Sequence, residues 1–283
     1  MNVRQVGKKI KSISNVKKIT NAMQLVSAVK MKKAQQRALD GRPYQDLLEE
    51  AIYNIVEKVD VTASPLLQAS KSNSNKTLTI AVTSNKGLCG SFNVSVIRSI
   101  AKQINKDNEF VTIGKKGSVL ISSLGGKVIA DFSEGNLIDG VSAVFQLALE
   151  KYLGGEYASV SLVYNKFIST LRYDPIEKKL LPFTLEERRR EAVAQTKNYE
   201  IEPDVETIMD ALLKSLLEEQ IRHAIVESEA GEHSARMIAM QNATENANNV
   251  IYNLTLLKNK LRQQSITYEL LDMITAKESV EAS

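Results

Sequence analysis

The sequence is poor in the residues that most often build catalytic and cofactor sites. It has a single cysteine, Cys89, two histidines and no tryptophan among 283 residues, and aromatic side chains make up only 5%. One cysteine excludes an internal disulfide and is typical of a reducing compartment. The scarcity of aromatic side chains favours an aliphatic core over an aromatic-lined pocket.

Long hydrophobic runs are also missing. No stretch approaches the ~18 apolar residues of a membrane-spanning helix, so we expect a chain that does not cross a bilayer. The N-terminus shows no secretory signal pattern, and we expect the mature protein to begin directly in a helix.

Glycine and proline, the strongest breakers of regular structure, are nearly absent from both ends. All 13 glycines and 5 prolines lie between Gly41 and Pro203, except Gly7 and Gly231. Two long helical segments with a turn-rich middle follow from this distribution. We predict an N-terminal helical segment at 1–65, an α/β domain at 76–185 and a long C-terminal helix at 204–278.

The C-terminal segment contains a heptad repeat. Its members, which step by 3 and 4 residues alternately, are Met240, Ala243, Ala247, Val250, Leu254, Leu257, Leu261, Gln264, Tyr268 and Leu271. Such a repeat is the seam of a left-handed coiled coil, so the helix is expected to pair with another helix.

The N-terminal segment is amphipathic but less regular. Its apolar band consists of Val6, Ile10, Ile13, Val16, Ile19, Met23 and Val26. We expect the helix to break at Gly41-Arg42-Pro43 and a second helix to follow until Pro65. Neither terminal helix can keep its apolar stripe in water alone, which predicts an antiparallel coiled coil of the two ends.

The middle of the chain alternates between strand and helix patterns. The predicted strands are Leu78–Thr83, Phe110–Ile113, Ser159–Tyr164 and Phe167–Arg172, and the predicted helices are Val94–Ile104, Ser118–Leu124 and Leu137–Leu153. This alternation predicts a partly parallel sheet with helices on its faces. The fold class is therefore α+β or α/β, a Rossmann-like domain inserted between the two arms of the coiled coil.

No group of residues assembles into a catalytic or metal site. Cys89 follows a strand in a Gly-Leu-Cys-Gly turn, but a nucleophile needs a base, and both histidines fall on the predicted C-terminal helix. We interpret Cys89 as a small buried residue. Gly114–Ser118 lacks the spacing of a phosphate loop, and Glu232-His233 has no second histidine four residues away. We therefore predict no catalytic residue, no cofactor and no metal.

Positive charge is concentrated at the N-terminus. Residues 1–42 carry eleven basic side chains and one acidic side chain, Asp40. Such a segment binds nucleic acid, acidic lipids or an acidic protein surface. We favour a protein partner because no base-stacking aromatic residue precedes Tyr44. The basic face comprises Lys8, Lys9, Lys11, Lys17, Lys18, Lys30, Lys32 and Lys33.

The end of the C-terminal helix is apolar over a wide arc. Ile266, Leu270, Leu271, Met273 and Ile274 cover ~160° at ~100° per residue, more than one partner helix needs. Packing within this chain could absorb the surplus, but a sleeve formed by other subunits explains it more naturally.

Three segments in this order resemble the γ subunit of F-type ATP synthases. They are Ile10–Gln35, Thr83–Asn93 with the sequence TSNKGLCGSFN, and Ser228–Ile274, which contains SEAGEHSARMIAMQNATENA. The resemblance implies a non-catalytic rotor shaft inside an α3β3 hexamer. It also implies contacts with the ε subunit and the membrane c-ring, and coupling of ion flow to conformational cycling of the β subunits. No nucleic acid and no small-molecule substrate is implied.

The resemblance also assigns roles to individual residues. It places Met23 against a β subunit, with Arg236 opposite it on the other helix. Arg262, Gln263 and Thr267 match a cluster that contacts β-subunit loops. The tip, including Leu271 and Ile274, is expected to turn in an apolar bearing of the hexamer.

The same resemblance suggests a location. The sequence has no transit peptide, so we expect a bacterial protein that is peripheral on the cytoplasmic face of the cell membrane. A basic coiled-coil scaffold or nucleic-acid-binding protein, and a cysteine-dependent enzyme, are the alternatives.

Overall fold

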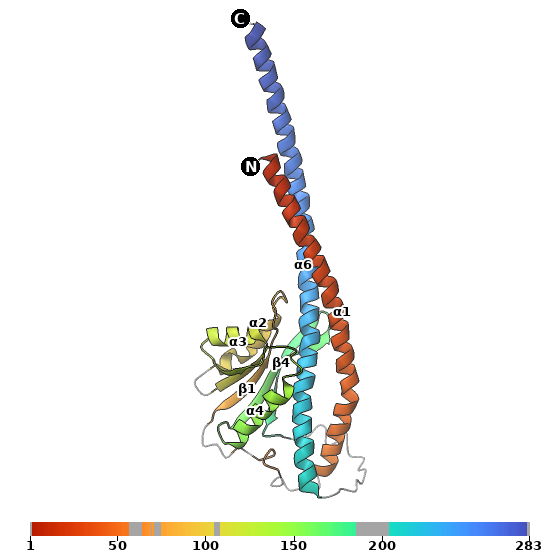
Figure 1. The fold of residues 1–283 in the computed structure, drawn as a ribbon, viewed down its shortest axis with the longest axis vertical. Coiled ribbons are helices and arrows are strands. Elements are labelled where there is room, and N and C mark those ends of the chain that lie inside the picture. Colours follow the sequence, from red (N-terminus) through yellow and green to blue (C-terminus); the bar gives the residue numbers. More distant parts are fainter. Residues whose placement is uncertain are drawn as a thin grey trace. The chain divides into compact units, whose positions relative to one another are not determined.

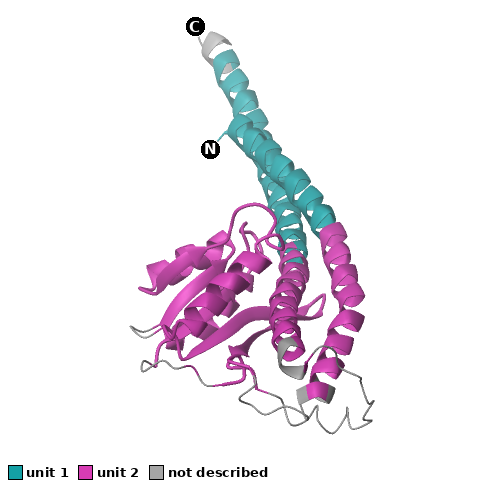
Figure 2. Cartoon of the chain, turned by 60° about the horizontal axis from the view of Figure 1, so that its bottom comes forward, with its two compact units in different colours: residues 1–27, 237–283 teal, residues 28–236 magenta. Residues whose placement is uncertain are grey.

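The computed structural model describes residues 2–56, 64–68, 70, 75–104, 108–184 and 204–281. It divides into two compact units (Figure 2). We call residues 1–27 with 237–283 the helical unit, and residues 28–236 the body unit. These units do not coincide with the three predicted segments, because both terminal helices contribute residues to both units.

The N-terminal helix α1 runs from Val3 to Val56 without interruption, so the predicted break at Gly41-Arg42-Pro43 is wrong. Pro43 lies inside the helix at an exposed position, where its ring projects into solvent. An internal proline costs about 3 kcal/mol. Burial of Leu48 and Ile52 beyond it offsets that cost. The predicted second helix is the end of α1, and its continuation over 57–63 lies outside the described residues.

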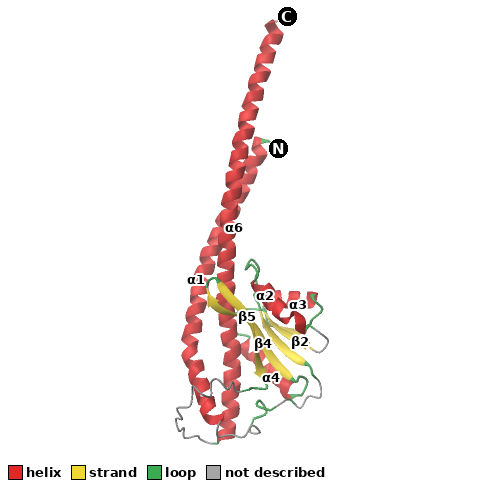
Figure 3. Cartoon of the chain, turned by 180° about the vertical axis from the view of Figure 1, so that it is seen from behind, coloured by secondary structure: helices red, strands yellow, loops and turns green. Residues whose placement is uncertain are grey.

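The C-terminal helix α6 (Val205–Glu281) lies beside α1 and runs antiparallel to it within each unit (Figures 1 and 3). The predicted helix pair is therefore confirmed. In the helical unit the Thr20 hydroxyl of α1 lies 2.7 Å from the Thr244 hydroxyl of α6. In the body unit the Arg37 guanidinium lies 3.6 Å from the Glu229 carboxylate.

The seam of α1 in the helical unit differs from the predicted apolar band. Val16, Ile19 and Val26 are 49%, 60% and 56% exposed and face away from it. Val6, Ile10 and Ile13 of the predicted band are buried or half-buried, as expected. From Ile13 the seam continues by alternate steps of 4 and 3 residues through Lys17, Thr20, Gln24 and Ser27. Small and polar side chains replace apolar ones after Ile13, which is why hydrophobicity alone did not predict this seam.

The predicted seam of α6 is confirmed at five positions up to Leu261. Met240 and Ala247 are buried, and Ala243, Leu254 and Leu261 are half-buried. Every described side chain from 262 to 277 is exposed. The predicted continuation through Gln264, Tyr268 and Leu271 is therefore wrong within this chain. The reason is that α1 begins at Val3 and offers no further turn to pair with (Figure 1).

The body unit contains one five-stranded sheet with the order β3-β2-β1-β4-β5. The strands are β1 (Thr77–Val82), β2 (Asn108–Ile113), β3 (Lys127–Asp131), β4 (Ser159–Ser169) and β5 (Arg172–Leu181). All neighbours are parallel except β4 and β5, which form an antiparallel hairpin. This confirms the partly parallel sheet, although the sequence did not predict β3.

The hairpin turn lies later than predicted. Phe167 belongs to β4 and pairs with Tyr173 of β5, so the predicted strand Phe167–Arg172 is wrong. The polar pair Asn165-Lys166 suggested a turn, but Asn165 is fully buried within β4. Its side-chain amide donates a hydrogen bond to the Phe92 carbonyl at 2.8 Å. A polar side chain here joins the sheet to a helix.

Helices cover both faces of the sheet. They are α2 (Phe92–Ile100), followed by the 3-10 turn η2 (Ala101–Gln103), α3 (Lys115–Ser123) and α4 (Val141–Leu153). On one face, α2 and α3 enclose a cluster that includes Ala81 and Phe110. On the other, α4, α6 and the end of α1 share a larger cluster around Ile80 and Leu162. The body unit therefore uses both terminal helices in its core.

Replacing Ile52, which is 1% exposed in this core, with alanine is expected to lower the free energy of unfolding by about 3 kcal/mol, because it leaves a cavity. The matched change Ile19→Ala on the same helix should cost less than about 0.5 kcal/mol, because that side chain already faces solvent. Urea unfolding followed by circular dichroism measures both losses. Similar losses for the two variants would contradict the burial of Ile52 and the exposure of Ile19.

Candidate functional site

The end of α6 is an exposed helix with an apolar surface. We call residues 262–277 the tip. Leu271 and Ile274 are 51% and 54% exposed. About half or more of each other large apolar side chain of the tip is also exposed, namely Ile266, Tyr268, Leu270 and Met273. Monomeric proteins rarely leave such a continuous apolar surface in water, so this surface indicates a binding partner.

The polar residues that the resemblance assigned to the tip are also exposed. Arg262, Gln263 and Thr267 face solvent, and the Thr267 hydroxyl donates to the Gln263 carbonyl one turn earlier at 2.9 Å. The tip therefore gathers five of the predicted contact residues on a segment that nothing in the helical unit covers. Their contacts with β-subunit loops stay a prediction.

A second exposed apolar strip lies on α1 in the helical unit. Val16, Ile19 and Val26 form it at spacings of 3 and 7 residues, and Leu25 widens it. Met23 is half-buried between these positions. Val16, Ile19 and Val26, which hydrophobicity assigned to the seam, are thus exposed on the outer side of the helix. Polar residues repeat at Thr20, Gln24 and Ser27 with the spacing of a coiled-coil seam. This repeat is the sequence signal that could have distinguished the seam residues of α1 from its surface residues.

The basic face is mostly solvent-exposed. Lys17 is the exception, since it is half-buried at a seam position. The exposed members are Lys8, Lys9, Lys11 and Lys18 in the helical unit and Lys30, Lys32 and Lys33 in the body unit. None of them forms an ion pair with another described residue, so their charge is available to an outside partner.

Arg236 is buried at 7% exposure and bonded within the body unit. Its Nε and Nη2 atoms donate to the Gly87 and Lys86 carbonyls at 3.2 and 3.0 Å. Its Nη2 also lies 2.6 Å from the Glu232 carboxylate. The planar guanidinium suits such multiple contacts, and here it fixes a loop to α6. That Arg236 also opposes Met23 stays a prediction, since the two residues belong to different units.

The loop fixed by Arg236 contains Cys89. Leu88 and Gly90 adopt left-handed backbone conformations with φ of 64° and 58°, which turns the Cys89 side chain inward. The thiol is 2% exposed, and the Asn93 amide donates to its sulfur at 3.3 Å. Burial raises the pKa of the Cys89 thiol. These contacts agree with its interpretation as a small buried residue in a tight turn.

The start of α3 is bonded to the same loop. The amide of Lys115 donates to the Asn85 side chain at 3.0 Å, and that of Lys116 to the Ser84 carbonyl at 3.0 Å. The Gly117 amide donates to the Thr83 hydroxyl at 2.8 Å. A Cβ at Gly117 would lie 2.6 Å from that hydroxyl oxygen, so the glycine permits the contact. The amides that hold a phosphate in a phosphate loop are thus occupied by the chain itself.

Across the described ranges, no three His, Cys, Asp or Glu side chains are grouped in a way that could hold a metal ion. Nor does any described helix carry an apolar stretch long enough to span a bilayer.

Arg236→Gln is expected to destabilise the body unit by about 2–4 kcal/mol, because it removes the buried guanidinium that bonds two loop carbonyls and the half-buried Glu232 carboxylate. Loosening of the loop should also raise the reaction rate of Cys89 with a disulfide reagent about tenfold or more. The control is Arg222→Gln, since its ion pairs with Glu218 and Glu219 are partly exposed and contribute little. An unchanged Cys89 rate in Arg236→Gln would contradict this role.

Comparisons with known proteins agree on one family. The family model described as ATP synthase matches residues 2–280. The ATP synthase gamma chain of Methylacidiphilum infernorum is 36% identical over 286 residues, covering 96% of this chain and 97% of that relative. The ATP synthase gamma chain of Variovorax paradoxus is 37% identical over 283 residues, covering 96% of each chain.

Solved structures show the same architecture. A chain from the mitochondrial ATP synthase of Tetrahymena thermophila, solved as central stalk and c-ring, has a TM-score of 0.58 at 26% identity and covers 80% of this chain and 99% of its own. A chain from the Euglena gracilis mitochondrial enzyme has a TM-score of 0.70 at 17% identity, covers 99% and 95%, and supports the fold alone. With relatives of this identity along nearly its whole length, the chain belongs to the ATP synthase gamma chain family.

Proposed function

We propose that this chain is the central rotor subunit of the F1 sector of an ATP synthase. It couples ion flow through a membrane c-ring to conformational cycling of catalytic β subunits, and it performs no bond chemistry itself. The observation that carries the proposal is the tip of α6, which leaves the α1 seam after Leu261 with its apolar side chains uncovered. Family membership supplies the complex in which this surface has a partner.

The tip suits a ring-shaped partner better than a single helix. Its apolar side chains point in several directions around α6, so a sleeve of α and β subunits covers more of them than one neighbour would. Leu271 and Ile274 then turn against an apolar collar. Arg262, Gln263 and Thr267, one to three turns earlier, contact polar loops of the β subunits.

The outer side of α1 provides a second contact with the hexamer. Val16, Ile19 and Val26 expose an apolar strip, and Met23 lies at its edge. Exposed lysines flank the strip, and acidic surfaces of the β subunits complement them. A strip of apolar groups flanked by charge gives an interface both affinity and orientation.

The body unit is proposed to meet the ε subunit and the c-ring. Its sheet is covered by helices on both faces, so neither face is open as a ligand crevice. The amides at the start of α3, a helix N-terminus that could otherwise bind an anion, are occupied by the chain itself. The chain is then peripheral, on the cytoplasmic face of a bacterial membrane, and is held there by the complex.

Catalysis by this chain has no support in the described residues. Cys89 is buried, and the His233 ring contacts Arg236 and Glu229 rather than the thiol. A rotor instead changes the barriers of substrate binding and product release at sites on other subunits. Family membership also leaves the nucleic-acid-binding and scaffold alternatives without support.

Deleting residues 262–283 is expected to leave the chain folded, because every described side chain from 262 to 277 is exposed. The deletion should lower the coupled ATPase that the full chain restores to α and β subunits, by about tenfold or more if the tip carries the contact. Circular dichroism and reconstituted ATPase measure the two effects. The isolated full chain should hydrolyse no ATP. Full coupling by the shortened chain would refute the proposed role of the tip.

Met23→Lys is expected to impair proton-driven ATP synthesis more than ATP hydrolysis, because it places a new cation among the β-subunit contacts. Asn21→Lys is the matched control, since it adds the same charge two residues away, on the opposite side of the helix. Synthesis and hydrolysis rates in reconstituted vesicles provide the comparison. An equal fall in both rates for Met23→Lys would contradict the proposed contact between Met23 and a β subunit.

A further inference from the structure

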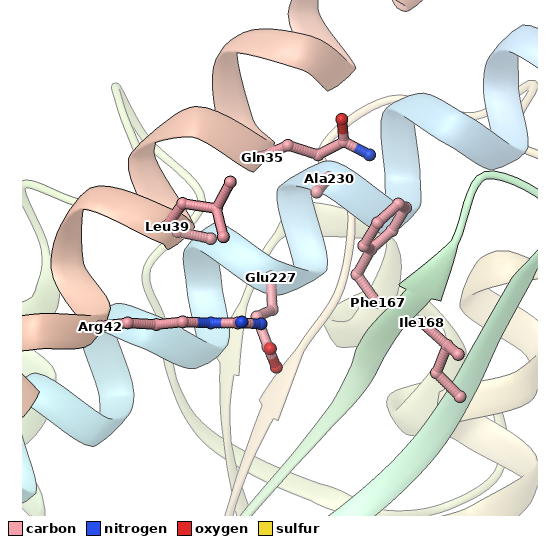
Figure 4. Close-up of a pocket in the computed structure, with 8 residues that line it drawn as sticks. Gln35, Leu39, Arg42, Phe167, Ile168, Glu227 and Ala230 are labelled. Atoms are coloured by element: carbon pink, nitrogen blue, oxygen red, sulfur yellow. The ribbon is translucent and has the colours of Figure 1, made fainter. Parts of the chain in front are cut away.

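The body unit contains a cavity of about 270 Å³ between α1, α6 and β4 (Figure 4). Gln35, Leu39 and Arg42 project into it from α1, and Glu227 and Ala230 from α6 (Figure 4). Ala38, Phe167 and Ile168 complete the lining. None of these residues belongs to the tip or to the exposed strip on α1, so the rotor role does not account for the cavity.

The Glu227 carboxylate is the unusual member of this lining. The residue is 4% exposed, and its Oε2 atom has no hydrogen-bond partner among the described residues. The closest ion-pair candidate is the His223 Nδ1 atom at 3.9 Å, which is too far for a hydrogen bond. A buried carboxylate oxygen without a partner is costly, and native structures rarely keep one without a reason.

The two neutral titratable side chains beside this carboxylate, His223 and Tyr164, bring no positive charge to it. Burial lowers the pKa of His223, and Arg42, Lys178 and Lys166 lower it further, against an opposite effect of Glu227. The imidazole is therefore neutral at neutral pH. Burial also raises the pKa of Tyr164, and the charge of the Glu227 carboxylate and a hydrogen bond to it add to that shift. The phenol therefore stays neutral and donates to this carboxylate, whose Oε2 atom is still without a partner. Arg42 and Glu227 both line the cavity (Figure 4), and no ion pair within 4.0 Å joins these two described residues.

The remaining walls are mainly apolar. Leu39 and Ile168 line the cavity with side chains that are about half exposed, and the Phe167 ring stands opposite α1 (Figure 4). The Gln35 amide adds one neutral polar group to the lining. Ligand sites of this kind combine apolar walls with a few polar groups that fix orientation. An aromatic ring near a carboxylate additionally favours a cation.

We propose that this cavity binds a small organic cation, an amine or amidine on a short apolar stem. The cationic group donates to the unpartnered oxygen of Glu227, and the stem packs between Leu39, Phe167 and Ile168. The volume limits the ligand to a compact molecule. Arg42 is an exposed cation at the cavity, so it opposes the ligand by like-charge repulsion. Its side chain moves away into solvent when the ligand enters.

Benzamidine is a suitable probe, because it joins a cationic amidine to one apolar ring. Titrated into the purified full chain, it should bind with a dissociation constant on the order of 1 mM, the range of a small fragment. Methyl NMR should show shifts at Leu39 and Ile168 and none at Leu270 or Ile274 of the tip. Benzyl alcohol, a neutral molecule of similar shape, should bind at least about tenfold more weakly.

Two variants should change the affinity in opposite directions. Glu227→Gln keeps the size of the side chain and should weaken benzamidine binding about tenfold or more. Arg42→Ala should strengthen it several-fold by removing a competing cation. Glu245→Gln, an exposed carboxylate on the same helix, is the control and should change nothing.

Three results would overturn the proposal. They are equal binding of benzamidine and benzyl alcohol, equal affinity of Glu227→Gln and Glu245→Gln, and methyl shifts confined to the tip. Because Arg42→Ala alters only an exposed side chain, unchanged affinity in that variant counts against the proposal even if Glu227→Gln does not fold.

Discussion

The structure depends on how α6 buries its apolar side chains against successive partners. In the body unit, Leu217 and Ile221 pack with the sheet, α4 and the end of α1. In the helical unit, Met240 and Ala247 pack on the α1 seam. After Leu261 no described partner remains. A single helix has little stability of its own in water. The contacts in the body unit and the helical unit therefore stabilise α6, and the tip after Leu261 remains exposed.

The seam between the two helices is narrow and partly polar, and this matters for function. Thr20 and Thr244 meet through their hydroxyls, and Ser27 occupies a position where a coiled coil usually has a large apolar residue. Small seam residues free the larger ones, Val16, Ile19 and Val26, for the outer surface. The chain thus gives up some stability in the pair and keeps an exposed apolar strip on α1.

Long-range organisation was predictable from the sequence, and local register was not. The scarcity of glycine and proline at both ends predicted the two long helices. The alternation of strand and helix patterns in the middle predicted most of the sheet. Hydrophobicity misplaced the α1 seam because polar residues from Lys17 onward continue it. It also suggested a turn at Asn165, whose buried amide instead bonds to α2. The predicted break at Pro43 was wrong because the side chains of Leu48 and Ile52, which follow it, are buried and stabilise the helix. The Glu227 cavity combines three elements far apart in the chain, so no local pattern could reveal it.

The central claim is that other subunits cover the tip of α6. Labelling of a single cysteine tests it most directly. In a Cys89→Ser background, Ile274→Cys should react rapidly with a maleimide in the free chain, where Ile274 is exposed. After assembly with α and β subunits, the account predicts a rate at least about tenfold lower, because the partner sleeve excludes the reagent. Equal rates in the free and assembled chain would contradict it.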